Sequence, residues 1–240
     1  MPHISVVTIC LNSASTICKT MESVLGQSCR DVEYVIQDGL SEDGTCELIG
    51  KYLFDERIDY RSEKDSGLYN AMNRAVKRCT GDYVLFLNSG DIFCDERVLE
   101  DMLPYLHEDI VFGNVIRLYE EGEKRETYRS ANRVFPLLLM GRMPCHQVIF
   151  ARREVLQRFA FREQFSITAD YDFLVRCHRQ GCSMLYVDRD VSRVDCVEGV
   201  SSQRENLNKM RSQDDESLKE SYPFWYQVLR PVKYLARRFL

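Results

Sequence analysis

Three aspartates stand just beyond short predicted strands, and they are the residues best placed to do chemistry. Asp38, Asp65 and Asp91 each lie in the polar segment that follows such a strand, and the run before Asp91 is apolar without a break, as in a strand buried on both faces. Ligands of open α/β sheets bind outside the carboxyl ends of the strands, so these acids are expected at a ligand site. A lone aspartate here would most often cap the next helix. Three at one edge repel one another unless a cation or a hydrogen-bond donor offsets their charge.

The elements that must position these acids alternate along roughly the first ninety residues. Predicted strands cover 4–9, 32–36, 58–61 and 83–87, and predicted helices cover 17–25, 45–54 and 68–79. Ser13 or Ser15 is the expected cap of the first helix. This rhythm is typical of an α/β protein with a doubly wound, mostly parallel sheet and right-handed crossovers.

The remaining segments predict further strands and helices of less regular order. We expect a helix over 95–106, a strand over 110–119 that turns back into a hairpin partner, a loop or short helix over 130–144, a strand over 147–151, helices over 153–159 and 170–179, a strand over 184–187, and an exposed, charged helix over 201–221.

Composition bounds the class of protein. The 240 residues suit one large domain or one domain with an appendage, and 45% hydrophobic residues suffice for a core. The formal net charge of -5 argues against nucleic acid as a partner. Ten cysteines occur without a Cys-x-x-Cys pair, as expected for reduced thiols. The first residues lack the pattern of a signal peptide, and no run is apolar and long enough to span a bilayer, so a cytoplasmic location is expected.

The last eighteen or so residues differ from the rest and divide the chain into a domain over 1–222 and a tail over 223–240. The tail carries basic but no acidic residues, and its apolar residues recur at helical spacing: Trp225, Val228, Leu229, Val232, Leu235 and Phe239. A basic amphipathic helix of this kind is typical of a membrane-surface element. A terminal helix packed on the core would give the same pattern.

Several common nucleotide and hydrolase motifs are missing from the sequence. There is no Gly-x-x-x-x-Gly-Lys, no Gly-x-Gly-x-x-Gly after the first strand and no Gly-x-Ser-x-Gly. A nucleotide, if one binds, is therefore not held by a P-loop or a dinucleotide fingerprint.

Five segments in order resemble the family 2 glycosyltransferases, which are inverting enzymes of the GT-A fold that use nucleotide sugars. The segments are 5–12, 37–45, 63–73, 81–91 and 169–173, within a match from about Ile4 to about Ser202. The pattern is most similar to bacterial enzymes that build surface polysaccharide on a lipid carrier. The resemblance implies a Rossmann-like GT-A domain, here with a C-terminal helical extension.

The resemblance also implies a nucleotide site. Thr8 and Asn12 would line the base and ribose pocket, and Asp38 would accept a hydrogen bond from the uracil imide. Asp65 would lie beside the nucleoside or the sugar. The other polar residues of these motifs that it places with the nucleotide are Asn73, Asn88 and Ser89.

For the reaction itself, the resemblance implies a cation and a general base. Asp91 would bind Mn²⁺ or Mg²⁺ bridging the diphosphate, and Asp170 would be the base, with Asp172 as the alternative. Without the resemblance, Asp170 would be read as a helix cap. Family members usually carry several acids where this chain has only Asp91, and often a glutamate at Ala169. One carboxylate can suffice, because such cations keep waters and substrate phosphates as ligands.

Two further segments suit the acceptor side or a lid. His146 and Gln147 would contact the acceptor or the diphosphate, although a satisfied histidine at a strand edge is an equal interpretation. Asp195 and the turn over 198–201 would close over the donor, with Gly199 as the hinge.

The expected function is transfer of a hexose or N-acetylhexosamine from a UDP-sugar to a lipid-linked saccharide acceptor, with inversion. The tail would hold the protein at the inner face of the cytoplasmic membrane. A sugar nucleotidyltransferase is one alternative, but its Gly-rich basic loop is missing after the first strand. A degenerate, nucleotide-binding regulatory domain is the other, suggested by the thinned acidic run before Asp91.

Overall fold

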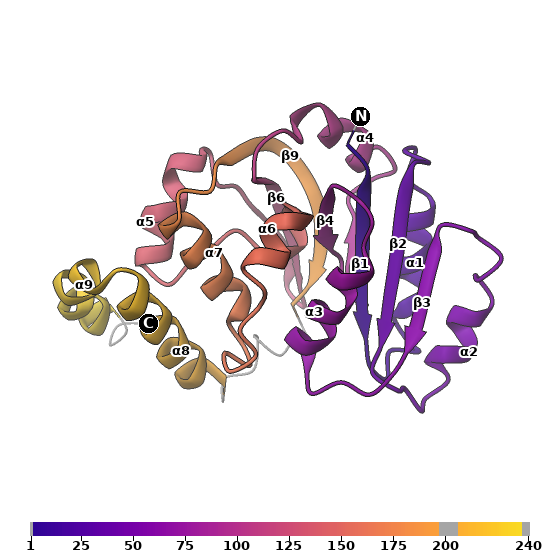
Figure 1. The fold of residues 1–240 in the computed structure, drawn as a ribbon, viewed down its shortest axis with the longest axis horizontal. Helices are drawn as coiled ribbons and strands as arrows, with labels where there is room; N and C mark the ends of the chain where they lie inside the picture. Colours follow the sequence, from indigo (N-terminus) through magenta and orange to yellow (C-terminus); the bar gives the residue numbers. More distant parts are fainter. Residues whose placement is uncertain (1, 197–205, 237–240) are drawn as a thin grey trace.

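The described residues build one nine-stranded sheet with helices on both faces (Figure 1). The computed structural model describes residues 2–196 and 206–236. The strand order is β3-β2-β1-β4-β8-β6-β9-β5, and β7 pairs with β6. The strands are β1 (Ile4–Cys10), β2 (Val32–Asp38), β3 (Ile58–Ser62), β4 (Tyr83–Phe86), β5 (Ile92–Phe93), β6 (Ile110–Tyr119), β7 (Gly122–Glu126), β8 (Ile149–Arg152) and β9 (Met184–Asp195).

The first four strands run parallel and align their carboxyl ends, as the sequence predicts. In the register of β1, β2 and β3, Cys10 lies opposite Asp38, and Asp38 lies opposite Ser62. β4 pairs with the other edge of β1. All seven residues of β1 are buried because both faces of the sheet are covered. The alignment brings the polar segments after these strands to one edge of the sheet.

The second half of the sheet is mixed. β8 is antiparallel to β4 and β6, whereas β9 is parallel to β6 and antiparallel to β5. The predicted hairpin of β6 and β7 is confirmed. The predicted strand over 184–187 is too short, because β9 continues through Asp188, Arg189 and Asp190 to Asp195. These charged residues stay in the strand because arginines and acids of neighbouring elements pair with them.

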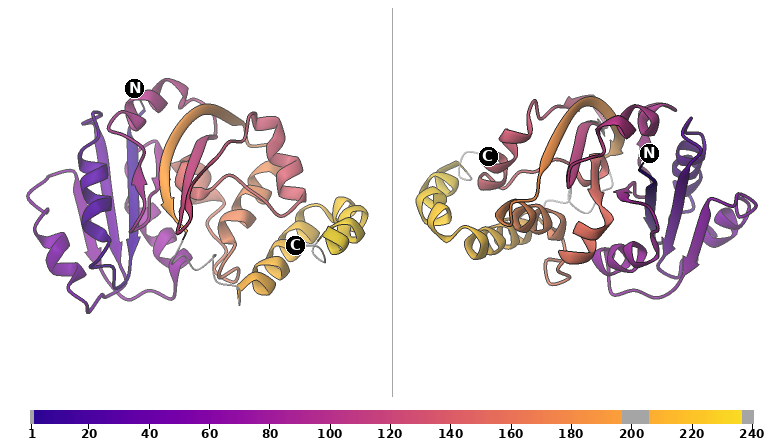
Figure 2. Two further views of the ribbon diagram at one scale, coloured as in Figure 1. Left: turned by 180° about the vertical axis from the view of Figure 1, so that it is seen from behind. Right: turned by 45° about the horizontal axis from the view of Figure 1, so that its top comes forward.

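Helices cover the sheet from two sides. The helices are α1 (Ile17–Leu25), α2 (Thr45–Gly50), α3 (Leu68–Arg78), α4 (Val98–Met102), α5 (Val134–Leu139), α6 (Arg153–Arg158), α7 (Ala169–Arg179), α8 (Leu207–Ser221) and α9 (Pro223–Ala236), with 3-10 turns η1 (Leu103–Tyr105), η2 (Ala131–Arg133) and η3 (His146–Val148). Figures 1 and 2 show α3 and α6 on one face and α1 on the other. α1 begins after Thr16, and no side chain caps it, so the predicted serine cap is wrong.

The C-terminal extension consists of α8 and α9, which reach away from β1–β3 beyond α7 (Figure 1). α8 packs against α7 and buries three polar residues, Gln213, Asp214 and Ser217. The prediction of a mostly exposed helix is therefore wrong for this face. Within 2–196 and 206–236, the length and apolar content that a membrane-crossing helix requires are not found together in any helix.

Candidate active site

Asp170, at the start of α7, lies among three hydrogen-bond donors. Its Oδ2 is 2.9 Å from His146 Nδ1, and its Oδ1 accepts from the Tyr69 hydroxyl and the Tyr171 amide, each at 2.9 Å. The side chain is 17% exposed, so it is nearly buried but not sealed. Burial acts to raise the pKa of Asp170, but the donors, led by His146, outweigh it and hold the pKa below its usual value. The carboxylate is therefore ionised at neutral pH, as a general base must be.

His146 connects Asp170 to the turn that follows β4. It lies in η3, just before β8, and its Nε2 is 3.0 Å from Asn88 Nδ2. Since the amide nitrogen donates, Nε2 accepts and the ring hydrogen sits on Nδ1, facing Asp170. Among the described residues, no donor reaches the buried Asn88 Oδ1. His146 thus orients the candidate base, a role that the sequence did not predict.

Asp172, the alternative base, lies outside this site, which favours Asp170 over it. The Asp172 side chain is 0% exposed. It accepts hydrogen bonds from Arg162 Nε at 2.9 Å, Arg176 Nε at 2.8 Å and Ser217 Oγ at 2.7 Å. Two residues along a helix correspond to about 200°, so the carboxylates of Asp170 and Asp172 point to opposite sides. An acceptor hydroxyl has no route to Asp172.

Asp91 follows β4 after a turn at Gly90, whose φ of 101° favours glycine. Its side chain is buried, with Oδ2 2.9 Å from Gln147 Nε2 and Oδ1 3.2 Å from the Asp195 amide. Burial raises the pKa of Asp91 to about 6, although the bond from Gln147 acts to lower it. Gln147, itself buried, therefore supports Asp91 in this structure.

The residues around Asp91 do not fit a metal ion held by the protein alone. Asp91 offers one carboxylate, and both of its oxygens already accept hydrogen bonds from the protein. In the described part of the chain, no group of three His, Cys, Asp or Glu side chains could hold an ion. Mg²⁺ and Mn²⁺ need further oxygen ligands, which a bound diphosphate and water would have to supply.

Asp38 anchors the loop that follows β2. It is 0% exposed, and its oxygens accept from the Ser41 amide at 3.0 Å, the Ser41 hydroxyl, and the Ser62 hydroxyl at 2.6 Å. Burial acts to raise its pKa, but the bonds from Ser41 and Ser62 outweigh this and lower it. Asn12, in a left-handed conformation with a φ of 49°, joins the same loop through its amide and side chain.

Asp65 comes from the loop after β3 and lies against Gly39. A Cβ on Gly39 would be 2.8 Å from Asp65 Oδ2, so a larger residue there would require the Asp65 side chain to shift. Its Oδ1 accepts from the Gly67 amide at 2.9 Å. Asp38 and Asp65 are thus neighbours, which confirms that their two strand ends meet.

Three other predicted nucleotide residues hold the scaffold together. Thr8 is 0% exposed, donates to Leu87 O at 2.7 Å and pairs with the Tyr34 hydroxyl at 3.0 Å. Asn73 bonds both main-chain groups of Phe161, at 2.8 and 2.9 Å. The Ser89 hydroxyl is 2.9 Å from the hydroxyl of Thr16, which is the N-cap residue of α1.

The predicted lid is only partly described. The Asp195 amide bonds Asp91, and its carboxylate is 3.9 Å from Lys19 Nζ. Gly199 and the turn over 198–201 lie outside the described residues.

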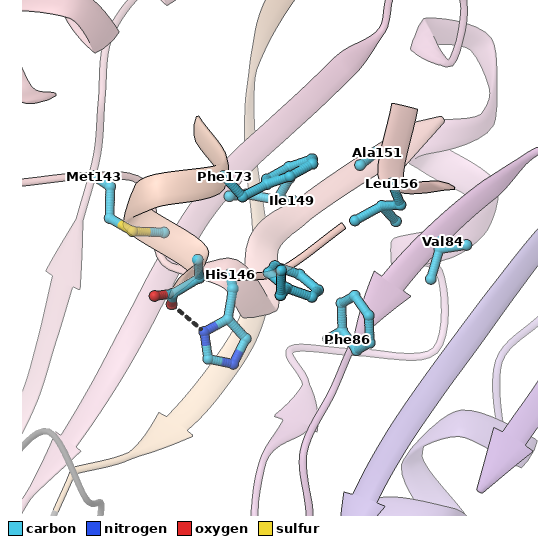
Figure 3. A pocket seen from close by; sticks show the side chains of 10 residues that line it. Val84, Phe86, Met143, His146, Ile149, Ala151, Leu156 and Phe173 are labelled. Carbon is cyan, nitrogen blue, oxygen red and sulfur yellow. Dashed lines mark hydrogen bonds and ion pairs between the residues drawn. The ribbon is translucent and has the colours of Figure 1, made fainter. Parts of the chain in front are cut away.

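A small apolar cavity of about 20 Å³ opens beside Asp170 and His146 (Figure 3). Aromatic and aliphatic residues of β4, β8, α6 and α7 line it: Val84, Phe86, Ile149, Ala151, Leu156 and Phe173. Figure 3 shows the His146–Asp170 hydrogen bond at one end of this wall. The candidate base therefore lies at the border of an apolar interior and the polar strand ends.

Comparisons with known proteins agree on the fold. The sequence model described as Glycosyl transferase family 2 matches residues 5–176. A PGL/p-HBAD biosynthesis glycosyltransferase of Mycobacterium tuberculosis is 32% identical over 185 residues, which cover 73% of this chain and 70% of that protein. The structure of S. aureus TarS 1-349 in complex with UDP-GlcNAc is 18% identical with a TM-score of 0.73, covering 92% of this chain and 67% of that one. Mannosyltransferase PcManGT from Pyrobaculum calidifontis, in complex with GDP-Man and Mn²⁺, is 16% identical with a TM-score of 0.72, covering 98% and 70%.

Proposed function

The chain belongs to glycosyl transferase family 2, and from this membership we propose that it transfers a hexose or N-acetylhexosamine from a UDP-sugar to a lipid-linked saccharide, with inversion. Its fold is GT-A, shared with TarS and PcManGT. The observation that carries the proposal is the ionised, nearly buried Asp170, held by His146 and Tyr69 at the edge of the sheet where the polar strand ends meet.

Asp170 acts as the general base in this proposal. As the acceptor oxygen attacks the anomeric carbon, the proton of its hydroxyl moves to Asp170. The bond from the anomeric carbon to the diphosphate breaks, and the electron pair leaves with UDP. Attack in line with the departing group inverts the configuration, so one base suffices. His146 donates from Nδ1 and keeps the carboxylate facing the site.

The donor side is formed by the polar segments after β1, β2, β3 and β4. Asn12, Asp38, Asp65, Asn88 and Ser89 remain our candidates for the nucleotide. The oxygens of Asp38 already accept hydrogen bonds from Ser41 and Ser62. Asp38 therefore shapes the nucleotide site by holding the loop after β2 in place. The likeness to the TarS fold, whose structure holds UDP-GlcNAc, supports a uridine donor, and the GDP-Man of PcManGT is the competing chemistry.

We infer that Mn²⁺ or Mg²⁺ enters together with the donor and not before it. When bound, such a cation neutralises charge on a diphosphate. Asp91 is the carboxylate that would face it, after exchanging the bonds from Gln147 or Asp195. Calorimetric titration with Mn²⁺ alone should give no binding, and titration in the presence of UDP should. Tight binding of Mn²⁺ to the protein without nucleotide would contradict this order.

The tail over 223–240 is proposed to hold the protein at the inner face of the cytoplasmic membrane. The described part of α9 supports this role, because Phe224, Trp225 and Val228 are 68%, 42% and 50% exposed. Trp225 also packs edge-on against Phe135 of α5, so the tail is anchored to the domain. Exposed aromatics on a basic amphipathic helix suit the lipid headgroup region.

Hydrolysis of the donor tests the proposed reaction without an identified acceptor, because water can take the acceptor's place. UDP-glucose, UDP-galactose and UDP-GlcNAc would be incubated with the protein, with and without Mn²⁺. We expect UDP release from at least one of them, and the sugar first released from an α-linked donor to be the β anomer by NMR. Tight UDP binding without release from any donor would favour the regulatory domain, and a first-formed α anomer would refute inversion.

A further inference from the structure

We propose that Gln213 of α8 is a positioning residue for the candidate base. The inference rests on the proposed function, since it takes Asp170 as the base. α8 lies beyond residues 5–176, the part of the chain that matches the family model. The extension would then serve the reaction as well as the stability of the domain.

Gln213 is buried, with 8% exposed, and its side-chain hydrogen bonds to described residues fall on the segment before Asp170. Its Oε1 accepts from the Ile167 amide at 3.1 Å, the Thr168 amide at 3.3 Å and the Thr168 hydroxyl at 3.4 Å. Its Nε2 donates toward Ser166 Oγ at 3.3 Å and Gln164 O at 3.5 Å. One amide group from a distant helix thus fixes the main chain that leads into α7.

These contacts satisfy main-chain amides directly before α7. The N-cap residue of α7 is Thr168, and its side chain makes no capping hydrogen bond. A capping side chain would accept from the second or third amide inside the helix. Gln213 accepts instead from the amides of Ile167 and Thr168, directly before the helix that carries Asp170.

A second link joins the same peptide to the carboxylate. The Tyr69 hydroxyl is 2.7 Å from Ile167 O and 2.9 Å from Asp170 Oδ1. The position of Ile167 therefore affects where the Tyr69 hydroxyl sits and how it meets the base. Gln213 acts on Asp170 through Ile167, both along the chain and through Tyr69.

Other contacts of α8 stabilise the packing of the helix away from the candidate site, which distinguishes them from those of Gln213. Ser217, four residues on, donates to Asp172 at 2.7 Å, and Glu220 pairs with Arg162 at 2.7 Å. All three lie on one face of the helix. Ser217 and Glu220 contact Asp172 and Arg162, outside the candidate site, whereas the hydrogen bonds of Gln213 fall on residues 164–168.

Loss of the Gln213 contacts should misplace Asp170 without altering the nucleotide side. A displacement of about 1 Å at a reacting group can cost on the order of a hundredfold in rate. We expect Gln213→Leu to lower kcat for donor hydrolysis by between about tenfold and a hundredfold. The KM for the donor should stay unchanged, because the nucleotide is proposed to bind at the strand ends on the other side of β4.

Three variants and two readouts test the inference. Gln213→Leu removes every polar contact, Gln213→Glu keeps an accepting oxygen for both amides, and Ser217→Ala breaks a buried hydrogen bond of the same helix that ends on Asp172. The first readout is kcat and KM for hydrolysis of the UDP-sugar that the wild-type protein cleaves. The second is hydrogen exchange of the Ile167 and Thr168 amides, which needs no turnover.

We expect Gln213→Leu to lose exchange protection at both amides and to lose kcat. Gln213→Glu should restore most of both, and Ser217→Ala should change neither once thermal stability is allowed for. Wild-type kcat in Gln213→Leu, or equal loss of kcat in Ser217→Ala, would overturn the inference. If the wild-type protein hydrolyses no donor, the proposed function fails, and unchanged amide protection in Gln213→Leu would still refute the role of Gln213.

Discussion

Tyr69→Phe should move the pH profile of the reaction, because it removes the hydroxyl that donates to the candidate base while keeping the ring. Tyr69 is 4% exposed, and phenylalanine keeps its ring in the core. The hydroxyl carries one hydrogen and faces two acceptors, Asp170 Oδ1 at 2.9 Å and Ile167 O at 2.7 Å. It can donate to Asp170 while the carboxylate is charged and turn to Ile167 once Asp170 has taken a proton.

The size of the shift follows from the strength of that bond. A hydrogen bond to a charged group contributes about 1.5–3 kcal/mol, and Ile167 competes for the same hydrogen, so we take the lower end. One pKa unit corresponds to about 1.4 kcal/mol, which gives a shift of about one unit. His146 leads the donors that lower the pKa of Asp170, and Tyr69 adds to it. Removing the Tyr69 hydroxyl therefore raises that pKa.

The assay is kcat for UDP release as a function of pH. The acid limb of the profile should move to higher pH by about one unit, because Asp170 must lose its proton before it can act as a base. Tyr171→Phe is a matched control, since it removes a buried hydroxyl that donates to Leu138 O of α5. An unmoved acid limb in Tyr69→Phe, a shift to lower pH, or an equal shift in the control would refute the reasoning.

Three further substitutions or truncations have definite outcomes. Asp91→Asn should stabilise the metal-free protein at neutral pH by about 1–3 kcal/mol, measured by urea unfolding. Burial raises the pKa of Asp91 to about 6, so the wild-type protein loses stability as the pH rises through that value. The stability gained by Asp91→Asn should vanish in acid, where Asp91 is protonated. Asp172→Asn should destabilise the fold by about 3 kcal/mol, since Arg162 and Arg176 lose a fully buried partner, again by urea unfolding. The wild-type protein should co-sediment with anionic lipid vesicles, and deleting residues 223–240 should leave the protein in the supernatant. A less stable Asp91→Asn at neutral pH, an unchanged stability of Asp172→Asn, or unchanged sedimentation would contradict the respective assignments.

The parallel half of the sheet could be predicted because its strands leave a simple signal. β1, β2 and β4 are buried almost throughout, so each appears as a short segment rich in apolar residues. β9 could not be predicted to its full length. Its middle is charged, and only the folded chain brings Arg125 to Asp188 and Asp190.

The site shows the same limit. The sequence placed Asp170 and Asp172 together at one helix start but could not separate them, since the difference lies in the distant Arg162 and Ser217 that enclose Asp172. The partner of His146 could not be predicted either, because its hydrogen bond with Asp170 joins residues 24 positions apart in the chain. Hydrogen bonds between segments that are far apart in the chain distinguish these residues from one another. The motif containing Tyr69 was visible, but not the direction of its hydroxyl.

The most direct measurement compares Asp170→Asn with the wild-type protein for UDP release from a UDP-sugar and for UDP affinity by calorimetry. Our account requires that turnover falls to background while UDP binds nearly as before, because Asp170 moves a proton and does not hold the nucleotide. Substantial turnover by Asp170→Asn would show that the base lies elsewhere. So would loss of turnover in Asp172→Asn under conditions where that variant is fully folded.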